Sequence, residues 1–331
     1  MNSTLEELVG KYRALGIDRQ LDYDKFYLYS IITHSTAIEG STITELENQI
    51  MFDNGIALKG KSLIEQNMNL DLKAAYERAL VFARQHSDVT VARLKELSAL
   101  TMKNTGTDYH TMLGDFSSAK GDLRLLNVTA GVGGKSYMSF NKVPSRLEQF
   151  CDNLNMLRHD AGKMSIQELY DMSFDAHFNL VTIHPWADGN GRMARLMMNW
   201  LQFENNLIPS RIFTDDKEEY IKALVETRES GDLGIFRTFM TEMMIRHLTN
   251  DIAAFEESIG ETAGEVIKLS TTDRIVSLIK ANPQHSAKSL AKEIGISAKG
   301  IEKQLAKLKS NGIIRRIGPD KGGSWEVIGV E

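Results

Sequence analysis

The spacing of hydrophobic residues divides most of this chain into helices. Apolar side chains recur every three to four residues through the first 260 positions, which is the period of an amphipathic α-helix. The fold is therefore expected to be mainly α. The spacing predicts helices over these ranges: 22–36, 44–53, 62–85, 91–101, 145–157, 165–181, 190–204, 217–229 and 233–260.

The order of these helices indicates four parts along the chain. Residues 1–90 form an N-terminal helical region, and residues 91–250 form a helical core. Residues 251–271 are a helical linker, within which 261–270 lacks a clear apolar period and is expected to be the connecting segment. Residues 272–331 form a separate small domain.

One segment of the core has a different pattern. At 125–140, two runs rich in β-forming residues flank Gly131, Gly133 and Gly134. Short β-prone runs on either side of glycines are typical of a hairpin. We therefore predict a β-hairpin at 125–140.

Residues 272–331 resemble a winged helix-turn-helix domain. Two helices are predicted, around Ile279 and over 286–293, and a third ends at Ser310 with Ile301, Leu305 and Leu308 on one face. β-prone runs at 312–317 and 324–328 then flank a glycine-containing turn, as the wing of such a domain would.

The C-terminal domain carries charge of the opposite sign to the rest of the chain. Residues 272–331 have a net charge of +5, and the remainder has a net charge of −10. In winged helix-turn-helix domains the third helix enters the major groove of DNA. Glu302 makes that helix less basic, and winged helices also dock proteins, so 272–331 has DNA or a protein as its expected partner. The cations placed to contact phosphates are Lys299, Lys303, Lys307, Lys309, Arg315, Arg316 and Lys321.

Composition points to a soluble cytoplasmic protein without a membrane partner. The 331 residues are 42% apolar and 25% charged, which is ordinary for globular proteins. Cys151 is the single cysteine, so it excludes an internal disulfide and fits a reducing compartment. The N-terminus lacks the basic segment followed by an apolar run that is typical of a signal peptide. No apolar run approaches the ~20 residues that cross a bilayer.

The densest group of chemically active side chains lies between two predicted helices. Pro185 ends the first helix, and Gly189 and Gly191 allow a tight turn whose backbone N–H groups, with the helix dipole, attract an anion. Arg192 and Arg195 share one side of the next helical turn, where two cations are unfavourable without an anion such as a polyphosphate. The segment reads His184-Pro185-Trp186-Ala187-Asp188-Gly189-Asn190-Gly191-Arg192-Met193-Ala194-Arg195.

This segment resembles the signature of the Fic family, His-Pro-Phe-x-Asp/Glu-Gly-Asn-Gly-Arg-x-x-Arg. The chain departs from it only at Trp186, which keeps an aromatic ring where the family has Phe. The resemblance covers approximately residues 35–246 and implies a Fic-type helical core with a short β-hairpin flap. It also implies protein adenylyltransferase activity, in which AMP passes from ATP to a Ser, Thr or Tyr hydroxyl of a target protein.

The resemblance implies a role for each matching residue. His184 would be the general base, and Asp188 would bind the Mg²⁺ that bridges the α- and β-phosphates of ATP. Gly191 favours AMP transfer, because a relative with Lys at that position transfers a phosphate instead. The residues implied in ATP binding are Gly189, Asn190, Gly191 and Arg192, with Arg195 on the γ-phosphate.

A second motif resembles the inhibitory sequence of the same family, Ser/Thr-x-x-x-Glu-Gly/Asn. It spans Ser35 to Gly40 and would place the Glu39 carboxylate on Arg195 in place of the γ-phosphate, with Ser35 holding the helix that carries Glu39. Because this motif precedes the core in the same chain, the inhibition would act in cis.

Three further features have more than one interpretation. The hairpin at 125–140 would bind the target protein as an added strand, or would be an ordinary surface hairpin. His177 is expected to be a core histidine rather than a catalytic one. Tyr220 would lie near the adenine of ATP or pack in the core.

Two other functions remain open on the sequence. The chain could be a DNA-binding regulator whose Fic core senses nucleotide, or an enzyme that removes AMP from a modified protein with Glu39 positioning water. The target protein, the signal that displaces Glu39 and the formation of a homodimer are not determined by the sequence.

Overall fold

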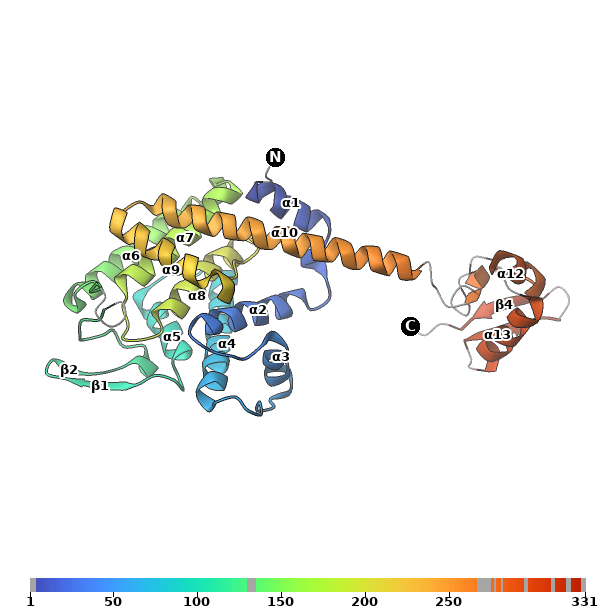
Figure 1. Ribbon diagram of the computed structural model, residues 1–331, viewed down its shortest axis with the longest axis horizontal. Helices are drawn as coiled ribbons and strands as arrows, with labels where there is room; N and C mark the ends of the chain where they lie inside the picture. Colours follow the sequence, from blue (N-terminus) through green and yellow to red (C-terminus); the bar gives the residue numbers. More distant parts are fainter. Residues whose placement is uncertain are drawn as a thin grey trace. The chain divides into compact units, whose positions relative to one another are not determined.

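The structure is a computed structural model that forms two compact units, Met1–Ile252 and Ala253–Glu331 (Figure 1). Each unit is considered by itself. The residues described are 4–129, 135–266, 275–276, 278–280, 282–294, 297–310, 313–319 and 323–328, and side chains from 260 to 266 are excluded.

The first unit is helical, as its apolar spacing predicts. Each predicted helix from 22–36 to 217–229 is present to within a few residues at its ends, and 91–101 agrees at both ends. The helices are α1 Leu5–Ala14, α2 Tyr23–Ile38, α3 Glu45–Asn54, α4 Leu63–Arg84, α5 Val91–Thr101, α6 Val143–His159, α7 Ile166–Ile183, α8 Asn190–Glu204, α9 Lys217–Ser230 and α10 Leu233–Val266. Short 3₁₀ helices occur at Ile17–Arg19, Ser118–Lys120, Phe140–Lys142, Ala161–Lys163 and Thr214–Asp216.

Side-chain caps explain where several helices begin. The Thr4 side chain accepts a hydrogen bond from Glu7 N–H, and the Glu7 carboxylate accepts one from Thr4 N–H. The same reciprocal cap starts α3, α4 and α7. Helix α1 was not among the predicted helices, although this Thr-x-x-Glu spacing was a usable signal for it.

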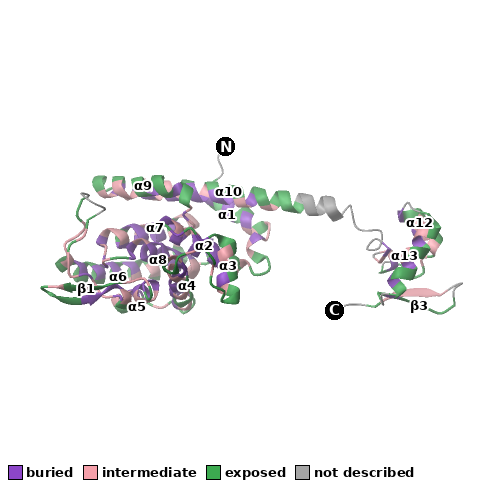
Figure 2. Ribbon diagram, turned by 60° about the horizontal axis from the view of Figure 1, so that its bottom comes forward, coloured by how far each residue is buried: buried purple, intermediate pink, exposed green. Residues whose placement is uncertain are grey.

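Helix α8 lies at the centre of the core, between α7 and α4 (Figure 2). Nearly all of its residues are buried, so this helix has no polar face directed to solvent. Trp200 stacks on Phe82 of α4 with ring centroids 5.3 Å apart. The motif turn that precedes α8 is therefore attached to the most rigid part of the unit.

A buried polar network fixes α2 to its neighbours. The Asn69 Oδ1 atom accepts hydrogen bonds from Thr36 Oγ1 and Asn48 Nδ2, each 2.8 Å long. Asn69 Nδ2 donates to Ser41 Oγ over 3.1 Å. Buried amides satisfied in this way hold adjoining helices in one arrangement. The end of α2, which carries Glu39, is thereby held by α3 and α4.

The regular hairpin of this unit is not at the predicted position. Strands β1 Asp108–Thr111 and β2 Gly114–Ser117 pair antiparallel, and Tyr109 stacks on Phe116 across them with centroids 4.7 Å apart. Within 125–140, the described residues form a single antiparallel bridge, Thr129 to Ser136. Residues 130–134 lie outside the described residues. The Tyr137 N–H also donates to the Val128 carbonyl, so the described residues of 125–140 pair antiparallel as predicted, over a short stretch. The 108–117 hairpin was not predicted.

The second unit has the predicted winged helix-turn-helix elements. They are α12 Ala287–Ile294, α13 Ala298–Ser310, β3 Ile314–Ile317 and β4 Ser324–Val327, with β3 and β4 antiparallel. Ile301, Leu305 and Leu308 of α13 are buried together against Ile275, Ile279 and Leu290. Lys321 of the wing lies outside the described residues.

The last helix of the first 266 residues is longer than the predicted helix 233–260 and continues into the predicted helical linker 251–271. Helix α10 runs to Val266, so the first six residues of 261–270 are helical. Residues such as Glu261, Ala263 and Glu265 are good helix formers, and no proline interrupts them. Among the described residues, no helix combines the length and apolarity needed to span a membrane.

Candidate active site

Two buried side chains hold the motif turn in place: the indole of Trp186 and the amide of Asn190. Trp186 is fully buried, and its indole N–H donates to the Gly121 carbonyl over 3.2 Å. Asn190 Oδ1 accepts from Trp186 N–H at 3.1 Å, while Asn190 Nδ2 donates to the Trp186 carbonyl at 2.9 Å. This reciprocal pair closes the loop 186–190. It also shows that the Asn190 side chain supports the loop from within.

His184 ends α7 in a left-handed conformation, with φ of 53°. Its Nδ1 atom lies 3.2 Å from the Val181 carbonyl oxygen. A carbonyl only accepts, so this contact places the proton of the neutral ring on Nδ1 and leaves Nε2 as the basic atom. Burial lowers the pKa of His184 to about 4. The neutral imidazole is therefore the dominant form at neutral pH.

Two arginines are buried at the start of α8. Arg192 and Arg195 are each 3% exposed. The Arg192 Nη2 atom contacts the Met102 sulfur at 3.0 Å, and its Nε and Nη1 atoms have no hydrogen-bond partner. Burial lowers the pKa of Arg192, with Asp188 the main group opposing it. A buried guanidinium with two unused N–H groups is costly, so this position is suited to an added anion.

The backbone at the same place also offers donors. Met193 N–H bonds to the Gly189 carbonyl at 2.9 Å, so the N–H groups of Asn190, Gly191 and Arg192 precede the helical ladder. Gly189 has φ of 81°, a conformation that favours glycine. The helix start thus combines unused N–H groups, the positive end of a dipole and Arg192.

Arg195 is paired with the end of α2. Its Nη2 atom lies 2.5 Å from Glu39 Oε1 and 2.9 Å from the Ser35 carbonyl, and its Nε donates to Ser35 Oγ over 2.8 Å. Burial alone would raise the pKa of Glu39, but the charge and hydrogen bond of Arg195, with the charges of Arg192 and Lys217, together outweigh burial, so the pKa is lowered. The structure therefore places both Ser35 and Glu39 against Arg195 of the motif. Glu39 and Arg195 form an ionised pair.

Gly191 is required for this contact. A Cβ at position 191 would lie 2.7 Å from Glu39 Oε1 and 3.1 Å from Arg195 Nη1. Any larger side chain would have to displace the Glu39 carboxylate. The lack of a side chain at position 191 therefore leaves room for the Glu39–Arg195 pair.

Asp188 is the one predicted metal ligand. Its carboxylate is 60% exposed, lies 3.7 Å from Arg192 Nη2, and accepts a hydrogen bond from Gly189 N–H at 2.6 Å. Within the described part of the chain, no group of three or more His, Cys, Asp or Glu side chains could hold a metal ion. Asp188 alone suits an ion that takes most of its oxygen ligands from phosphates and water, as Mg²⁺ does.

His177 and Tyr220 belong to the core. The Tyr220 hydroxyl lies 2.9 Å from His177 Nε2, and both side chains are buried. Burial lowers the pKa of His177 to about 3, so the ring is neutral. The interpretation of His177 as a core histidine therefore agrees with the structure, and Tyr220 packs in the core beside it.

Several residues of the site had no signal in the sequence. Arg124 is 1% exposed and donates to the carbonyls of His184 (2.8 Å), Leu126 (2.7 Å) and Met138. Tyr137 stacks on the His184 imidazole with centroids 3.7 Å apart. Both residues lie outside the motif, and only the folded chain brings them to it.

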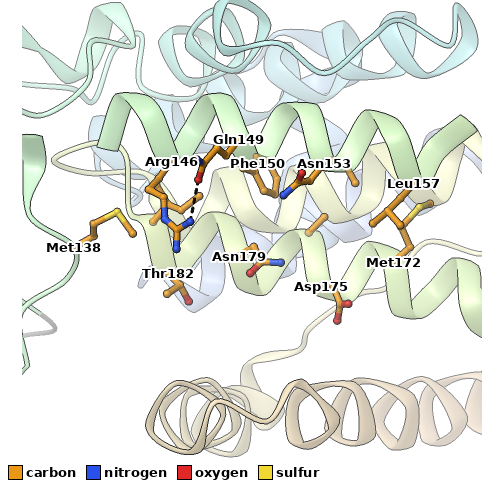
Figure 3. Close-up of a pocket in the computed structure, with 13 residues that line it drawn as sticks. Met138, Arg146, Gln149, Phe150, Asn153, Leu157, Met172, Asp175, Asn179 and Thr182 are labelled. Carbon is orange, nitrogen blue, oxygen red and sulfur yellow. Dashed lines mark hydrogen bonds between the residues drawn. The ribbon is translucent and has the colours of Figure 1, made fainter. Parts of the chain in front are cut away.

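A groove adjoins the site between α6 and α7 (Figure 3). Its volume is about 270 Å³, and it begins at Met138 and Ile183, the chain neighbours of Tyr137 and His184. Phe150 and Leu154 line its apolar part, and the amides of nearby residues such as Asn179 line its rim. It does not include the motif residues from 184 onward.

Comparison with known families agrees with this geometry. Residues 88–202 match the Fic/DOC family, and residues 269–315 match a winged helix-turn-helix DNA-binding family. The chain contains a Fic/DOC domain. The Fic match ends inside α8 and includes the whole of the motif, whereas Glu39 lies before it.

Curated relatives of the Fic domain are adenylyltransferases by name. The protein adenylyltransferase fic-1 of Caenorhabditis briggsae is 25% identical over 265 residues, which are 78% of this chain and 48% of the relative. The protein adenylyltransferase Fic of Nematostella vectensis is 26% identical over 227 residues, which are 67% of this chain and 48% of the relative. The chain spans about half the length of these relatives.

Solved structures share the fold. A Fic domain-containing signaling protein from Bacteroides thetaiotaomicron has a TM-score of 0.63 at 22% identity, covering 77% of this chain and 97% of its own. A Fic family protein from Desulfovibrio desulfuricans has a TM-score of 0.59 at 20% identity, covering 99% of this chain and 94% of its own. These likenesses confirm the mainly α fold class with a C-terminal winged helix-turn-helix.

Proposed function

We propose that this chain is a protein adenylyltransferase, which transfers AMP from ATP to a Ser, Thr or Tyr hydroxyl of a target protein. The observation that carries the proposal is the buried Arg192, whose Nε and Nη1 atoms lack partners at a helix start with unused backbone N–H groups. A polyphosphate satisfies all of these donors at once. The names of the curated relatives supply the transferred group.

The chemistry follows from His184 and its surroundings. Nε2 accepts the proton of the target hydroxyl as the hydroxyl oxygen attacks the α-phosphorus of ATP. The bond between the α-phosphorus and the bridging oxygen breaks, and pyrophosphate leaves. Because most of the barrier lies in positioning and charge, the main contribution of the site comes from the side chains of Arg192 and Arg195 and from the unused N–H groups of Asn190, Gly191 and Arg192. Residues 125–140 would hold the target chain beside His184.

Mg²⁺ fits the residues present. Asp188 would hold it from an exposed carboxylate while phosphate oxygens and water complete the shell. When bound, the ion would neutralise charge on the α- and β-phosphates.

The Glu39–Arg195 pair supports autoinhibition in cis as part of the proposal. Glu39 occupies the donors of Arg195 that a γ-phosphate would need, and Ser35 binds the same guanidinium. ATP and Glu39 would thus compete for one cation. The wild-type protein is expected to be restrained until α2 or Glu39 moves.

The identity of the transferred group is tested by labelled ATP. We would incubate the Glu39→Gly protein with Mg²⁺, host lysate and ATP labelled at the α- or the γ-phosphate, and measure intact masses of labelled proteins. Label from the α-phosphate alone, with the mass of AMP added, supports adenylyl transfer. Label from the γ-phosphate would instead indicate phosphate transfer and contradict the proposal.

A second candidate function is DNA binding by the winged helix. Lys299, Lys303 and Lys307 are exposed and recur every four residues on α13, on the side away from its buried apolar face. The wing is less available, because Arg315 is paired with Glu326 and Arg316 lies 4.8 Å from the Trp325 ring centroid. This basic helix face favours phosphate contacts, and the matched family is a DNA-binding one.

We predict salt-dependent binding of the full chain to duplex DNA through α13. Each phosphate contact adds about 0.9 to the slope of log K against log salt concentration, so replacing the three lysines by alanine should reduce the slope by about 2–3. The measurement is fluorescence anisotropy between ~50 and ~200 mM salt. The control removes the same charge elsewhere, at Lys59, Lys163 and Lys222. Equal slopes for both triple variants would argue that α13 docks protein instead.

A further inference from the structure

The His184 imidazole is covered by an aromatic ring that the motif does not include. Tyr137 stacks on it with ring centroids 3.7 Å apart and planes inclined by 17°. The Arg228 guanidinium lies over the same tyrosine ring, 5.0 Å from its centroid. Flat contact at this distance leaves no room for water between the two rings.

Contacts independent of His184 hold Tyr137 in place. Two successive residues at the end of α9 bind the segment: Arg228 packs on Tyr137, and Glu229 pairs with Lys135 at 2.6 Å. The Tyr137 N–H also donates to the Val128 carbonyl over 3.0 Å. These contacts hold the Tyr137 ring against the imidazole without depending on His184 itself.

Arg124 fixes the same segment to the backbone of His184. Its guanidinium donates to the carbonyl of Met138, the residue after Tyr137, and to the carbonyl of His184 itself. One buried side chain thus sets the spacing between the segment that carries Tyr137 and the end of α7. This explains how the stacked pair keeps its geometry.

The imidazole has little other support. The one hydrogen bond that the structure shows for it is from Nδ1 to the Val181 carbonyl, and at 3.2 Å this bond leaves the ring some freedom to turn. Errors of about 1 Å in the placement of a catalytic group cost roughly a hundredfold in rate. We propose that Tyr137 is a positioning residue for His184, which holds the imidazole in place and away from water so that Nε2 can accept the proton. The proposal rests on the proposed function.

The contact has a predicted effect on pH dependence. Burial is the main cause of the low pKa of His184; the Val181 hydrogen bond and Asp188 raise it, and Arg124 and Arg228 lower it. Removing Tyr137 admits water to the ring, so the pKa of His184 should rise towards its ordinary value of about 6.5. A general base works when unprotonated, so activity is lost as pH falls through that pKa. The acid limb of the profile should therefore move to higher pH.

The test compares Tyr137→Ala with Tyr137→Phe in the full chain carrying Glu39→Gly. We expect Tyr137→Ala to lower kcat/KM about tenfold or more at pH 8. Between pH 8 and pH 5.5 it should lose a further four- to tenfold, roughly, while the parent stays nearly flat. Tyr137→Phe keeps the stacked ring and should retain most of the activity and the flat profile.

Two controls separate this contact from general effects. Tyr109→Ala removes a stacked aromatic from the β1–β2 hairpin, outside the motif, and should keep the parent profile. Circular dichroism at pH 5.5 checks that each variant is folded. A Tyr137→Ala protein with the parent rate and profile, or a Tyr137→Phe protein as impaired as Tyr137→Ala, would overturn the proposal.

An activity-independent measurement distinguishes failure of this proposal from failure of the proposed function. The imidazole of His184 can be titrated by NMR in the parent and in Tyr137→Ala, with His184→Asn identifying the signal. A higher pKa in Tyr137→Ala supports the contact even if the parent transfers no AMP, an outcome that would refute the adenylyltransferase proposal alone. An unchanged pKa overturns the role of Tyr137.

Discussion

Replacing Glu39 by glycine is expected to raise AMP transfer by about 10- to 150-fold. The basis is the charge-assisted hydrogen bond from Arg195 to Glu39, 2.5 Å long, because such bonds contribute roughly 1.5–3 kcal/mol and each ~1.4 kcal/mol is a factor of ten in affinity. Glu39 is one-third exposed, so screening favours the lower part of this range. The measurement is the initial rate of α-label incorporation, together with the ATP dissociation constant of both proteins.

Two variants show whether the released charge is the cause. Glu39→Gln keeps the length of the side chain without its charge and should give a smaller increase than Glu39→Gly. Asp24→Gly removes a carboxylate from the first turn of the same helix, far from the motif, and should leave the rate unchanged. An unchanged rate in Glu39→Gly would refute the inhibitory role. Loss of AMP removal from a modified target in that variant would identify the reverse enzyme instead.

The helices could be predicted because their signals are local. Apolar spacing placed α2 to α9 to within a few residues, since it depends on neighbours three or four positions away. The fold class followed from the resemblance that the motif carries. The contact between Glu39 and Arg195 was also predicted from the family resemblance. In the structure the Glu39 carboxylate and the Arg195 guanidinium are in contact.

The remaining features depend on contacts between distant residues. The β1–β2 hairpin has a weak apolar alternation, and Tyr109 stacking on Phe116 stabilises it only once the strands have paired. Arg124 lies outside both motifs, and its carbonyl partners Leu126, Met138 and His184 are 2, 14 and 60 positions away in the sequence. Tyr137 likewise reaches His184 across 47 positions of sequence. No periodicity or spacing encodes such contacts.

These contacts place two kinds of restraint on one site. On the side of α2, Glu39 is paired with Arg195, and the Asn69 network holds the end of that helix in position. On the side of the 125–140 segment, Tyr137 and Arg124 hold His184. Under the proposed function, the first restraint would oppose ATP binding, and the second would prepare the base for the hydroxyl. Variants at the two positions should therefore change different properties. A Glu39 variant should change ATP affinity, and a Tyr137 variant should change the pH profile of activity.

Replacing His184 should lower AMP transfer by at least about a hundredfold in the Glu39→Gly background. A positioned general base contributes typically 10²- to 10⁴-fold, and His184 carries a neutral imidazole with an unprotonated Nε2 at the motif. ATP binding should persist, because the donors proposed for phosphate are Arg192, Arg195 and backbone N–H groups. The measurements are single-turnover transfer and ATP affinity.

The choice of replacement decides how this result is interpreted. His184 has φ of 53°, a left-handed conformation that alanine tolerates poorly, so His184→Ala could lose activity through a distorted loop. Asparagine adopts this conformation more readily and has no titratable nitrogen, so His184→Asn should keep the loop and still lose the transfer. Transfer by His184→Asn within about tenfold of the parent would exclude the general-base role, since general bases contribute more than that. Intact ATP affinity with transfer lost in both variants would instead support His184 as the general base.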